Sequence, residues 1–399
     1  MTIDTAAAVF APLAADFYGF ADELTDAEKE ALARLRAHLE AEVKPLVTEH
    51  WERATFPREI IPGLHEQGVA AFAWEETRPF ENSAVFRGFA ALELARVDAS
   101  VATYVGVQNG LAAGSISICG SPEQRAQWLP KLASGELIGS FGLTEPLSGS
   151  DSAQGLRTTA RHEGDHWVLN GSKRWIGNAT FGDITVIWAK DEADGQVKGF
   201  IVPNDSPGFV ATKIENKVSL RIVQNADITL TDVVVPDANK LANANSFRDT
   251  AKVLRQTRAE VAWEAVGIAI GAYEAALRYA KERVQFGKPL AAHQLVQDLL
   301  VKSLGNITAS LALVVQVSKM LDRGTQRDEH SALAKAFATS KMRETVAWCR
   351  EALGGNGIVL DHDAARFFAD AEAIYSYEGT REMNTLIVGR AITGQAAFV

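Results

Sequence analysis

The sequence contains little that would support a disulfide framework, a metal site or binding to nucleic acid. Cys119 and Cys349 are the only cysteines among 399 residues. They match no metal-ligand or disulfide spacing, which is typical of a reducing compartment, so we predict no metal. The formal net charge is −10, and the chain has no polybasic tract. Because a phosphate backbone requires a basic surface, we also predict no nucleic-acid partner.

Targeting and membrane signals are scarce as well. By inspection of the sequence, no apolar stretch is long and uncharged enough to span a bilayer, so no membrane partner is expected. Residues 1–20 lack a basic segment and run into Asp16, unlike a secretory signal. The chain ends in Ala397-Phe398-Val399, which matches no peroxisomal tripeptide. The expectation is therefore a cytoplasmic protein.

The residues that are present indicate a large globular chain with three zones. A composition of 47% hydrophobic and 23% charged residues at this length predicts two or three domains. Helical periodicity begins with a capping-box spacing between Thr25 and Glu28 and continues to about residue 137. Short β-branched runs separated by turn residues then fill residues 141–235. Long helical periods return from residue 247, with breaks at Gly287, Gly324 and Gly354.

These zones predict an α+β fold. The expected units are an N-terminal helical domain (residues 1–140), a central β domain (141–246) and a C-terminal four-helix bundle (247–399). Residues 261–276 are apolar on nearly every face and are expected in the middle of the bundle.

The segment Tyr377-Glu378-Gly379-Thr380 is the first candidate for chemistry. It places a carboxylate beside a glycine at the junction of two expected helices. A carboxylate on approachable backbone, next to aromatic residues, is suited to general-base work. Alone, the segment also fits a helix end capped by glycine. The interpretation as a general base therefore depends on the other motifs.

Four further motifs lie at the joints between the zones. Each has an ordinary structural interpretation (a turn, a buried strand Trp, a surface Arg, a helix stop) beside a ligand-binding one. None has the strand-to-helix Rossmann context or a P-loop lysine, so nicotinamide and ATP are poorly supported. The motifs are Thr144-Glu145-Pro146-Leu147-Ser148-Gly149-Ser150-Asp151, Trp175-Ile176-Gly177, Arg283-Val284-Gln285-Phe286-Gly287 and Gly354-Gly355-Asn356-Gly357.

With the Glu378 segment, these motifs resemble the acyl-CoA dehydrogenase superfamily of flavoenzymes, in order, over residues 24–398. The likeness is greatest to the glutaryl-CoA dehydrogenase branch and to plant short-chain acyl-CoA oxidases. It implies FAD as cofactor, an acyl-CoA substrate, a homotetramer and a role in fatty-acid β-oxidation. Glu378 would remove the α-proton of the thioester while the β-hydrogen leaves as hydride to flavin N5. The backbone N–H of Glu378 would polarise the thioester carbonyl.

The resemblance also implies binding residues. Those expected to contact FAD are Phe141, Leu143, Thr144, Gly149, Ser150, Trp175, Ile176, Gly177, Arg283, Gln285, Phe286, Glu351, Gly355, Thr380 and Glu382. The group from Arg283 to Phe286, with Glu351 and Gly355, would hold the ADP half of an FAD bound mainly to a neighbouring subunit. Those expected to contact substrate are Ser150, Arg258, Glu378 and Gly379.

Two departures from the family pattern bear on specificity. Gly177 stands where most dehydrogenases have a threonine whose hydroxyl lies near flavin N5, and the plant oxidases share this feature. Ala102 stands where glutaryl-CoA dehydrogenases place an arginine for the distal carboxylate. A buried carboxylate without that partner is costly, so a dicarboxylic acyl-CoA is disfavoured.

Three functions are compatible with the sequence. The first is dehydrogenation of a short-chain, monocarboxylic acyl-CoA to the trans-2-enoyl-CoA, with electrons passed to an electron-transferring flavoprotein. The second is an acyl-CoA oxidase that uses O2, which Gly177 favours. The third is a non-catalytic acyl-CoA or flavin-binding protein, which the presence of Glu378 disfavours.

Overall fold

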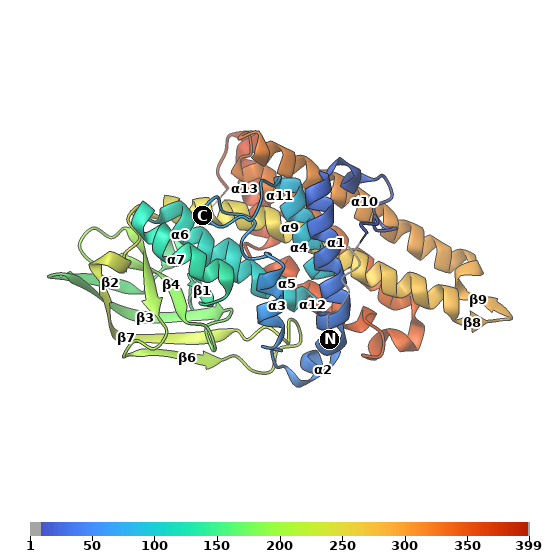
Figure 1. The fold of residues 1–399 in the computed structure, drawn as a ribbon, viewed down its shortest axis with the longest axis horizontal. Helices are drawn as coiled ribbons and strands as arrows, with labels where there is room; N and C mark the ends of the chain where they lie inside the picture. Colours follow the sequence, from blue (N-terminus) through green and yellow to red (C-terminus); the bar gives the residue numbers. More distant parts are fainter. Residues whose placement is uncertain (1–8, 398–399) are drawn as a thin grey trace.

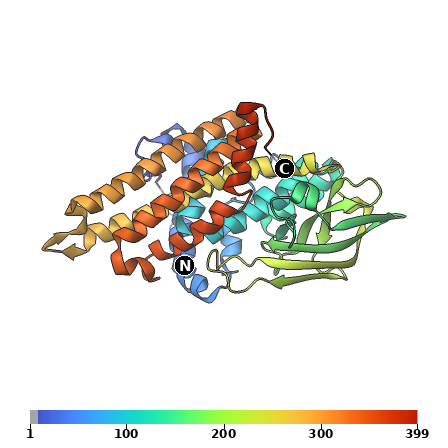
Figure 2. The same ribbon diagram turned by 180° about the vertical axis from the view of Figure 1, so that it is seen from behind.

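The computed structural model describes residues 9–397, so Phe398 and Val399 lie outside the described residues. A β-sheet occupies one end of the molecule, and a pair of long helices, α9 and α10, extends to the other end (Figure 1). The N-terminal helices lie between these parts in both views (Figures 1 and 2). This arrangement confirms the predicted fold class.

The N-terminal helical zone begins with the predicted capping box. Thr25 Oγ1 accepts from Glu28 N (3.3 Å), and the Glu28 carboxylate accepts from Thr25 N (2.9 Å). Two stretches, η2 and η3, have π-helical hydrogen bonding that periodicity did not predict. The elements are η1 (Phe20–Glu23), α1 (Asp26–His38), η2 (Leu39–Val43), α2 (Lys44–Arg53), α3 (Ile60–Glu66), α4 (Ala84–Val97), α5 (Ala99–Val105), η3 (Gly106–Ala113), α6 (Gly114–Cys119) and α7 (Pro122–Ser134).

The β-branched runs form a seven-stranded mixed sheet in the order β1-β4-β2-β3-β7-β6, with β5 paired to β4. β1 and β2 pair with β4 in parallel, whereas β3, β5 and β7 run antiparallel to their partners. Side chains of β1, β4 and β5 form one apolar cluster with the N-terminal helices. A second apolar cluster lies among the strands β2 to β7 themselves. The elements are β1 (Gly139–Gly142), α8 (Ser152–Gly155), β2 (Thr159–Glu163), β3 (His166–Ile176), β4 (Ile184–Asp191), β5 (Val197–Pro203), β6 (Phe209–Lys213), β7 (Ala226–Pro236) and η4 (Asp237–Asn239).

The C-terminal zone is a helical bundle around α9, whose apolar stretch is buried in the main core cluster as predicted. Helix α4 also packs against α9, joining the N-terminal zone to the bundle. Gly287, Gly324 and Gly354 have φ of 76°, 67° and 58° at the three expected breaks. The elements are α9 (Phe247–Glu282), β8 (Val284–Gln285), β9 (Lys288–Pro289), η5 (Leu290–Ala292), α10 (Gln294–Asp322), α11 (Asp328–Ala352), η6 (Gly354–Ile358), α12 (Ala364–Ser376) and α13 (Arg381–Thr393).

One expectation about hydrophobic runs is wrong. Helix α10 is 29 residues long and has an 18-residue window of mean hydropathy 1.5, enough to cross a membrane by length and composition. Its Ile307, Leu311 and Val314 lie in the core of the bundle, although only 39% of the window is buried. A bundle helix passes this test because one face is buried and the opposite face carries few charges.

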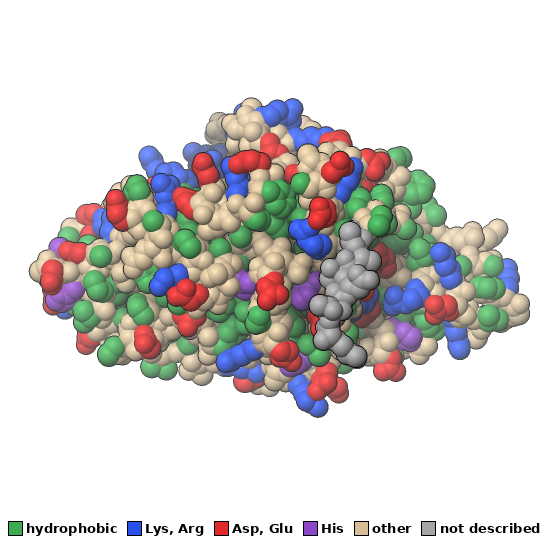
Figure 3. Space-filling view, in the orientation of Figure 1, with side chains coloured by type: hydrophobic (Ala, Val, Ile, Leu, Met, Phe, Trp, Pro, Cys, Tyr) green, Lys and Arg blue, Asp and Glu red, His purple; other side chains and the backbone are tan. Residues whose placement is uncertain are grey.

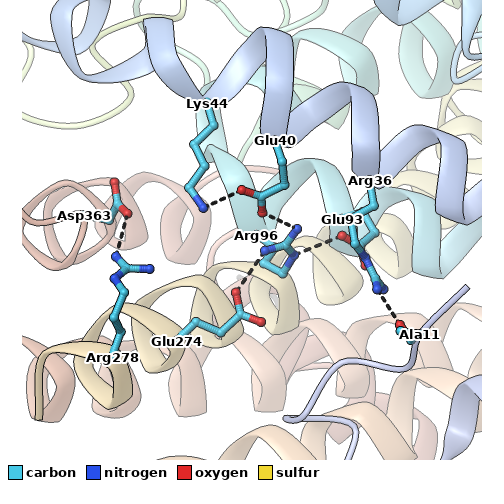
Figure 4. A network of polar contacts seen from close by, with 9 residues as sticks. All are labelled: Ala11, Arg36, Glu40, Lys44, Glu93, Arg96, Glu274, Arg278 and Asp363. Carbon is cyan, nitrogen blue, oxygen red and sulfur yellow. Dashed lines mark hydrogen bonds and ion pairs between the residues drawn. The ribbon is translucent and has the colours of Figure 1, made fainter. Parts of the chain in front are cut away.

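A buried ionic network fastens the N-terminal helices to the bundle (Figure 4). Arg96 of α4 pairs with Glu93 (3.0 Å), with Glu40 of η2 (2.8 Å) and with Glu274 of α9 (2.9 Å). Burial opposes the charged form, but these carboxylates raise the pKa of Arg96 above its ordinary value. Removing one member would leave buried charge uncompensated, so the network fixes α4 against α9.

Charges of both signs are interspersed on the face seen in Figure 3, without a stripe of one sign. Apolar exposure is pronounced at the β8–β9 hairpin, where Phe286 is 95% exposed and Val284 52% exposed. The hairpin lies at the end of the molecule opposite the sheet (Figure 1).

Candidate active site

Glu378 lies in a tight connection between α12 and α13. Helix α12 ends at Ser376, and Thr380 caps α13 by accepting a hydrogen bond from Met383 N (3.3 Å). Glu378 and Gly379 both have left-handed backbone, with φ of 51° and 84°. A non-glycine residue in this region is uncommon and requires support from its surroundings. The predicted junction of two helices is therefore present, in a specialised geometry.

Three side chains hold this connection. Thr257 Oγ1 of α9 donates to Glu378 Oε2 (2.7 Å). The fully buried Lys335 of α11 donates from Nζ to the carbonyl oxygens of Tyr375 (3.0 Å) and Gly379 (2.7 Å), which flank Glu378. Asn384 also donates to the Gly379 carbonyl (2.8 Å). Hydrogen bonds thus hold both the side chain of Glu378 and the backbone on either side of it.

The predicted Arg258 belongs to the same cluster. Its Nε is buried without a hydrogen-bond partner among residues 9–397. It lies 3.8 Å from the point where a Cβ on Gly379 would stand. A buried donor without a partner is unfavourable, so this atom is available to an acceptor on a bound molecule.

Two further carboxyl groups lie on α9 near Glu378. Tyr377 donates from its hydroxyl to Glu264 Oε2 (2.6 Å). Burial raises the pKa of Glu264 to about 7, the Tyr377 hydrogen bond opposes this shift, and Glu378 adds to it. Burial likewise raises the pKa of Glu260 to about 8, with Glu264 and Glu378 adding to the shift. Carboxyl groups this close favour a protonated state because they cannot all ionise cheaply.

On the sheet side, the loop that contains Thr144, Gly149 and Ser150 is held by a buried ion pair. Glu145 Oε1 accepts from Lys173 Nζ (2.9 Å) and from Thr158 Oγ1 (2.6 Å). Burial lowers the pKa of Lys173 to about 8, and Glu145 opposes the shift. Gly149 and Ser150 are exposed on this anchored loop. A fixed loop with free hydroxyl and N–H groups is suited to binding an acceptor-rich ligand.

The predicted Trp175 is at the end of β3, with φ of 67° and half of its surface exposed. The Arg174 guanidinium lies 4.9 Å from its ring centroid. Gly177 follows, and a Cβ added there would lie 3.1 Å from Val107 Cγ2 of η3. The side chains of Phe141, Leu143 and Ile176 are instead buried in the apolar clusters. Ligand contact from these three would come chiefly through their backbone or ring edges.

A third group of predicted residues lies apart from the other two. Arg283, Gln285 and Phe286 are on or beside the exposed β8–β9 hairpin, at the end of the molecule opposite the sheet (Figures 1 and 2). Glu351 and Gly355 are exposed at the end of α11 and in η6, and a Cβ on Gly355 would meet nothing within 4 Å. Within one chain the structure does not bring this group to the sheet.

Several supporting residues were not predicted from the sequence: Thr257, Glu260, Glu264, Lys335 and the Glu145–Lys173 pair. The spacing of Thr257, Glu260 and Glu264, just before and within the apolar stretch of residues 261–276, was a usable signal. Polar residues at i, i+3 and i+7 share one helix face. On a buried helix such residues are uncommon, so they indicate a structural or functional role. Lys335 carried no comparable local signal.

Comparison with known proteins identifies the family. The N-terminal, middle and C-terminal domain models of acyl-CoA dehydrogenase match residues 25–136, 140–233 and 247–393. The chain therefore belongs to the acyl-CoA dehydrogenase family, which confirms the resemblance and the expected enzyme class, an oxidoreductase. The family consists of FAD-dependent flavoproteins of β-oxidation and is typically homotetrameric, in agreement with the expectations from the sequence.

Individual relatives cover nearly the whole chain. The mouse mitochondrial short-chain specific acyl-CoA dehydrogenase is 31% identical over 92% of this chain and 90% of its own length. Glutaryl-CoA dehydrogenase from Mycobacterium smegmatis superposes with a TM-score of 0.92 and 36% identity, covering 96% of this chain and 99% of that one. A second structure of that enzyme contains FADH2; there the identity is 34%, the TM-score 0.92 and the coverage 96% and 98%.

A third relative is a chain in a structure of the electron transferring flavoprotein of Acidaminococcus fermentans. It has a TM-score of 0.89 and 30% identity, with 94% of this chain and 99% of that one covered.

Proposed function

We propose that this protein is an FAD-dependent acyl-CoA dehydrogenase that oxidises a short-chain, monocarboxylic acyl-CoA to the trans-2-enoyl-CoA, with Glu378 as the base for the α-proton. The observation that carries the proposal is the fixed Glu378 carboxylate. It is held by Thr257 at 2.7 Å on a left-handed connection that Lys335 supports. A base held rigidly in one orientation needs little reorganisation when it receives a proton.

The residues on the sheet side fit a flat cofactor. Trp175 presents a half-exposed ring, Gly177 beside it is buried and carries no side chain, and Ser150 lies on an anchored loop. When bound, FAD supplies the acceptor for the β-hydride. Thr144, Gly149, Ser150, Trp175 and Gly177 would hold its ring system, and Thr380 and Glu382 lie beside the base for contacts to it.

The chain would bind substrate with its own polar groups. The N–H of Glu378 would donate to the thioester carbonyl, which stabilises negative charge that develops there and acidifies the α-proton. Arg258 would offer its unpartnered Nε to an acceptor of the CoA part. Ser150 and Gly379 would contact the same thioester region.

The hairpin group supports a shared cofactor site. Arg283, Gln285, Phe286, Glu351 and Gly355 are exposed and distant from the sheet of their own chain. We propose that they hold the ADP half of an FAD bound to a neighbour in a homotetramer. The domain division 1–140, 141–246 and 247–399 belongs to this proposal, as does a cytoplasmic location.

Electron-transferring flavoprotein is the proposed acceptor, supported by the likeness to the Acidaminococcus fermentans structure. The alternative is an oxidase, favoured by one observation: Gly177 offers no hydroxyl beside the cofactor position. A dicarboxylic substrate is disfavoured because Ala102 is buried and cannot pair with a distal carboxylate.

Anaerobic mixing of the FAD-loaded protein with butyryl-CoA tests the proposal. Bleaching of the flavin, followed by slow reoxidation in air and fast reoxidation by an electron-acceptor dye, is the expected result. Fast reoxidation in air would establish the oxidase instead. If no acyl-CoA bleaches the flavin, the protein is instead a non-catalytic acyl-CoA or flavin-binding protein.

A further inference from the structure

The side of α9 that faces Glu378 carries two carboxyl groups that proton abstraction does not require. Thr257, Glu260 and Glu264 lie on one face of this helix, opposite the glycines of η3. A Cβ on Gly110 would lie 2.7 Å from Glu260 Oε2 and 3.3 Å from Thr257 Cγ2. The absence of a side chain at Gly110 therefore leaves the space that the Glu260 carboxyl group occupies, directly beyond the threonine that holds the base.

A cavity of about 120 Å³ adjoins Glu260, between α4, α9, α10, η3 and the segment at residues 69–74. Its wall is mainly apolar, but it includes polar side chains. These are Arg87, Asn109, Gln256, Glu260 and Ser318. The cavity is thus not a plain alkyl pocket.

Glu260 has no hydrogen-bond partner among the residues that the structure describes. The Arg87 cation acts on it, but Arg87 donates to Asn82 Oδ1 (2.8 Å) and pairs with Asp322 (3.9 Å). The other charged groups that act on Glu260 are Glu264 and Glu378, both acidic. Glu260 is half-buried and lines a mainly apolar cavity, where a carboxyl group without a partner is unfavourable. An alkyl chain beside it would not change that.

We propose that the acyl group of the substrate carries a hydrogen-bond donor, a hydroxyl or an ammonium group, and that Glu260 accepts from it in the cavity that it lines. This inference rests on the proposed function, since it places the acyl chain between η3 and α9 with its C2 at Glu378. A donor on the chain would satisfy Glu260, whereas a distal carboxylate would face the carboxyl groups of Glu260 and Glu264.

The test compares thioesters matched in number of heavy atoms, with rates of anaerobic flavin reduction as the readout. The pairs are 4-hydroxybutyryl-CoA against pentanoyl-CoA, 5-hydroxypentanoyl-CoA against hexanoyl-CoA, and 6-aminohexanoyl-CoA against heptanoyl-CoA. We expect the donor-bearing member of at least one pair to reduce the flavin about tenfold more efficiently, because an unpaired polar group in a mainly apolar site discriminates strongly. A preference for the amino compound alone would assign an ammonium group, and one for the hydroxy compounds a hydroxyl.

Two variants assign the effect to Glu260. Glu260→Leu has a similar size and no acceptor, so it should abolish or reverse the preference. Glu260→Gln keeps an acceptor and should retain a preference for hydroxyl but lose one for ammonium. Retained FAD binding shows that each variant is folded.

The inference is overturned if the wild type prefers the alkyl member of all three pairs, or if Glu260→Leu leaves the ratios unchanged. Faster reduction by glutaryl-CoA than by hexanoyl-CoA would also overturn it. That result would indicate that Arg87 binds the distal carboxylate of the substrate in the cavity. Failure of the proposed function differs from all of these outcomes, because then neither member of any pair, nor butyryl-CoA, would bleach the flavin.

Discussion

Thr257 donates a 2.7 Å hydrogen bond to Glu378, linking the most buried helix of the bundle to the connection between α12 and α13. The bond fixes one carboxylate oxygen, and the other has no hydrogen-bond partner among residues 9–397. Thr257 is therefore a positioning residue for the proposed base.

Thr257→Val should lower the rate of flavin reduction by about tenfold with little effect on acyl-CoA binding. Valine keeps the shape of threonine but cannot donate, so the Glu378 side chain would sample other orientations. Stopped-flow reduction and product-binding titrations measure the two effects separately. Thr257→Ser keeps the hydroxyl and should restore most of the rate; equal losses in both variants would contradict this role.

Glu378→Gln should abolish flavin reduction, by roughly 10³-fold or more, while FAD and crotonyl-CoA still bind. The amide keeps the size and can accept from Thr257, but it cannot take up the α-proton. Anaerobic reduction by butyryl-CoA gives the rate, and the absorbance change on adding crotonyl-CoA gives the binding. A variant that is still reduced at the wild-type rate would remove Glu378 from the mechanism.

Much of this site follows from the sequence because its parts are local. The connection at Glu378, the loop before Asp151 and the breaks at Gly287 and Gly354 were all predicted from adjacent residues. In each case glycine or a capping residue determines the backbone over a few positions.

The interior of the site depends on contacts between distant segments. Glu260 and Glu264 occupy space that exists only because Gly110 and Gly106 of η3 lie opposite them. Lys335 lies 44 residues before the Gly379 carbonyl to which it donates. No periodicity in either segment encodes such pairings. Length and composition alone make α10 resemble a membrane span, whereas its packing places Ile307, Leu311 and Val314 in the core of the bundle.

Lys335→Met should lower the rate of flavin reduction by about tenfold or more at unchanged FAD content. Methionine fills the buried space but leaves the carbonyls of Tyr375 and Gly379 without their donor, so the left-handed backbone at Glu378 loses support. Lys335→Gln retains an N–H donor and should recover part of the rate. A fall in thermal stability alone, with reduction unaffected, would make Lys335 merely structural.

Glu264→Gln should stabilise the protein at alkaline pH relative to the wild type. Burial raises the pKa of Glu264 from 4.5 in the unfolded chain to about 7, so the folded state binds more protons between these values. Stability from this group is therefore present below about pH 4.5 and is lost as the pH rises through about 7. The loss is about 3 kcal/mol.

Glutamine at position 264 does not ionise and still accepts from Tyr377, so it escapes that loss. Denaturant unfolding at pH 5 and pH 8 measures the difference between wild type and variant. The advantage of Glu264→Gln should grow from pH 5 to pH 8. An advantage that is constant with pH would show that Glu264 does not titrate in this range.

Gly177→Thr should slow the reoxidation of the reduced enzyme by air, in comparison with Gly177→Ala. Both changes place a Cβ 3.1 Å from Val107 Cγ2, so the valine must shift by a few tenths of an ångström in either variant. Only threonine adds a hydroxyl at the proposed flavin position, where a donor would stabilise the reduced cofactor against oxygen. The alanine variant therefore separates the effect of the hydroxyl from the effect of crowding.

Combining Gly177→Thr with Val107→Ala should relieve the crowding and keep the slow reoxidation. The measurement is the rate at which flavin absorbance returns after anaerobic reduction with butyryl-CoA and mixing with aerated buffer. If both variants reoxidise at the same rate, the missing hydroxyl does not control oxygen reactivity. Gly177 would then no longer favour the oxidase over the dehydrogenase.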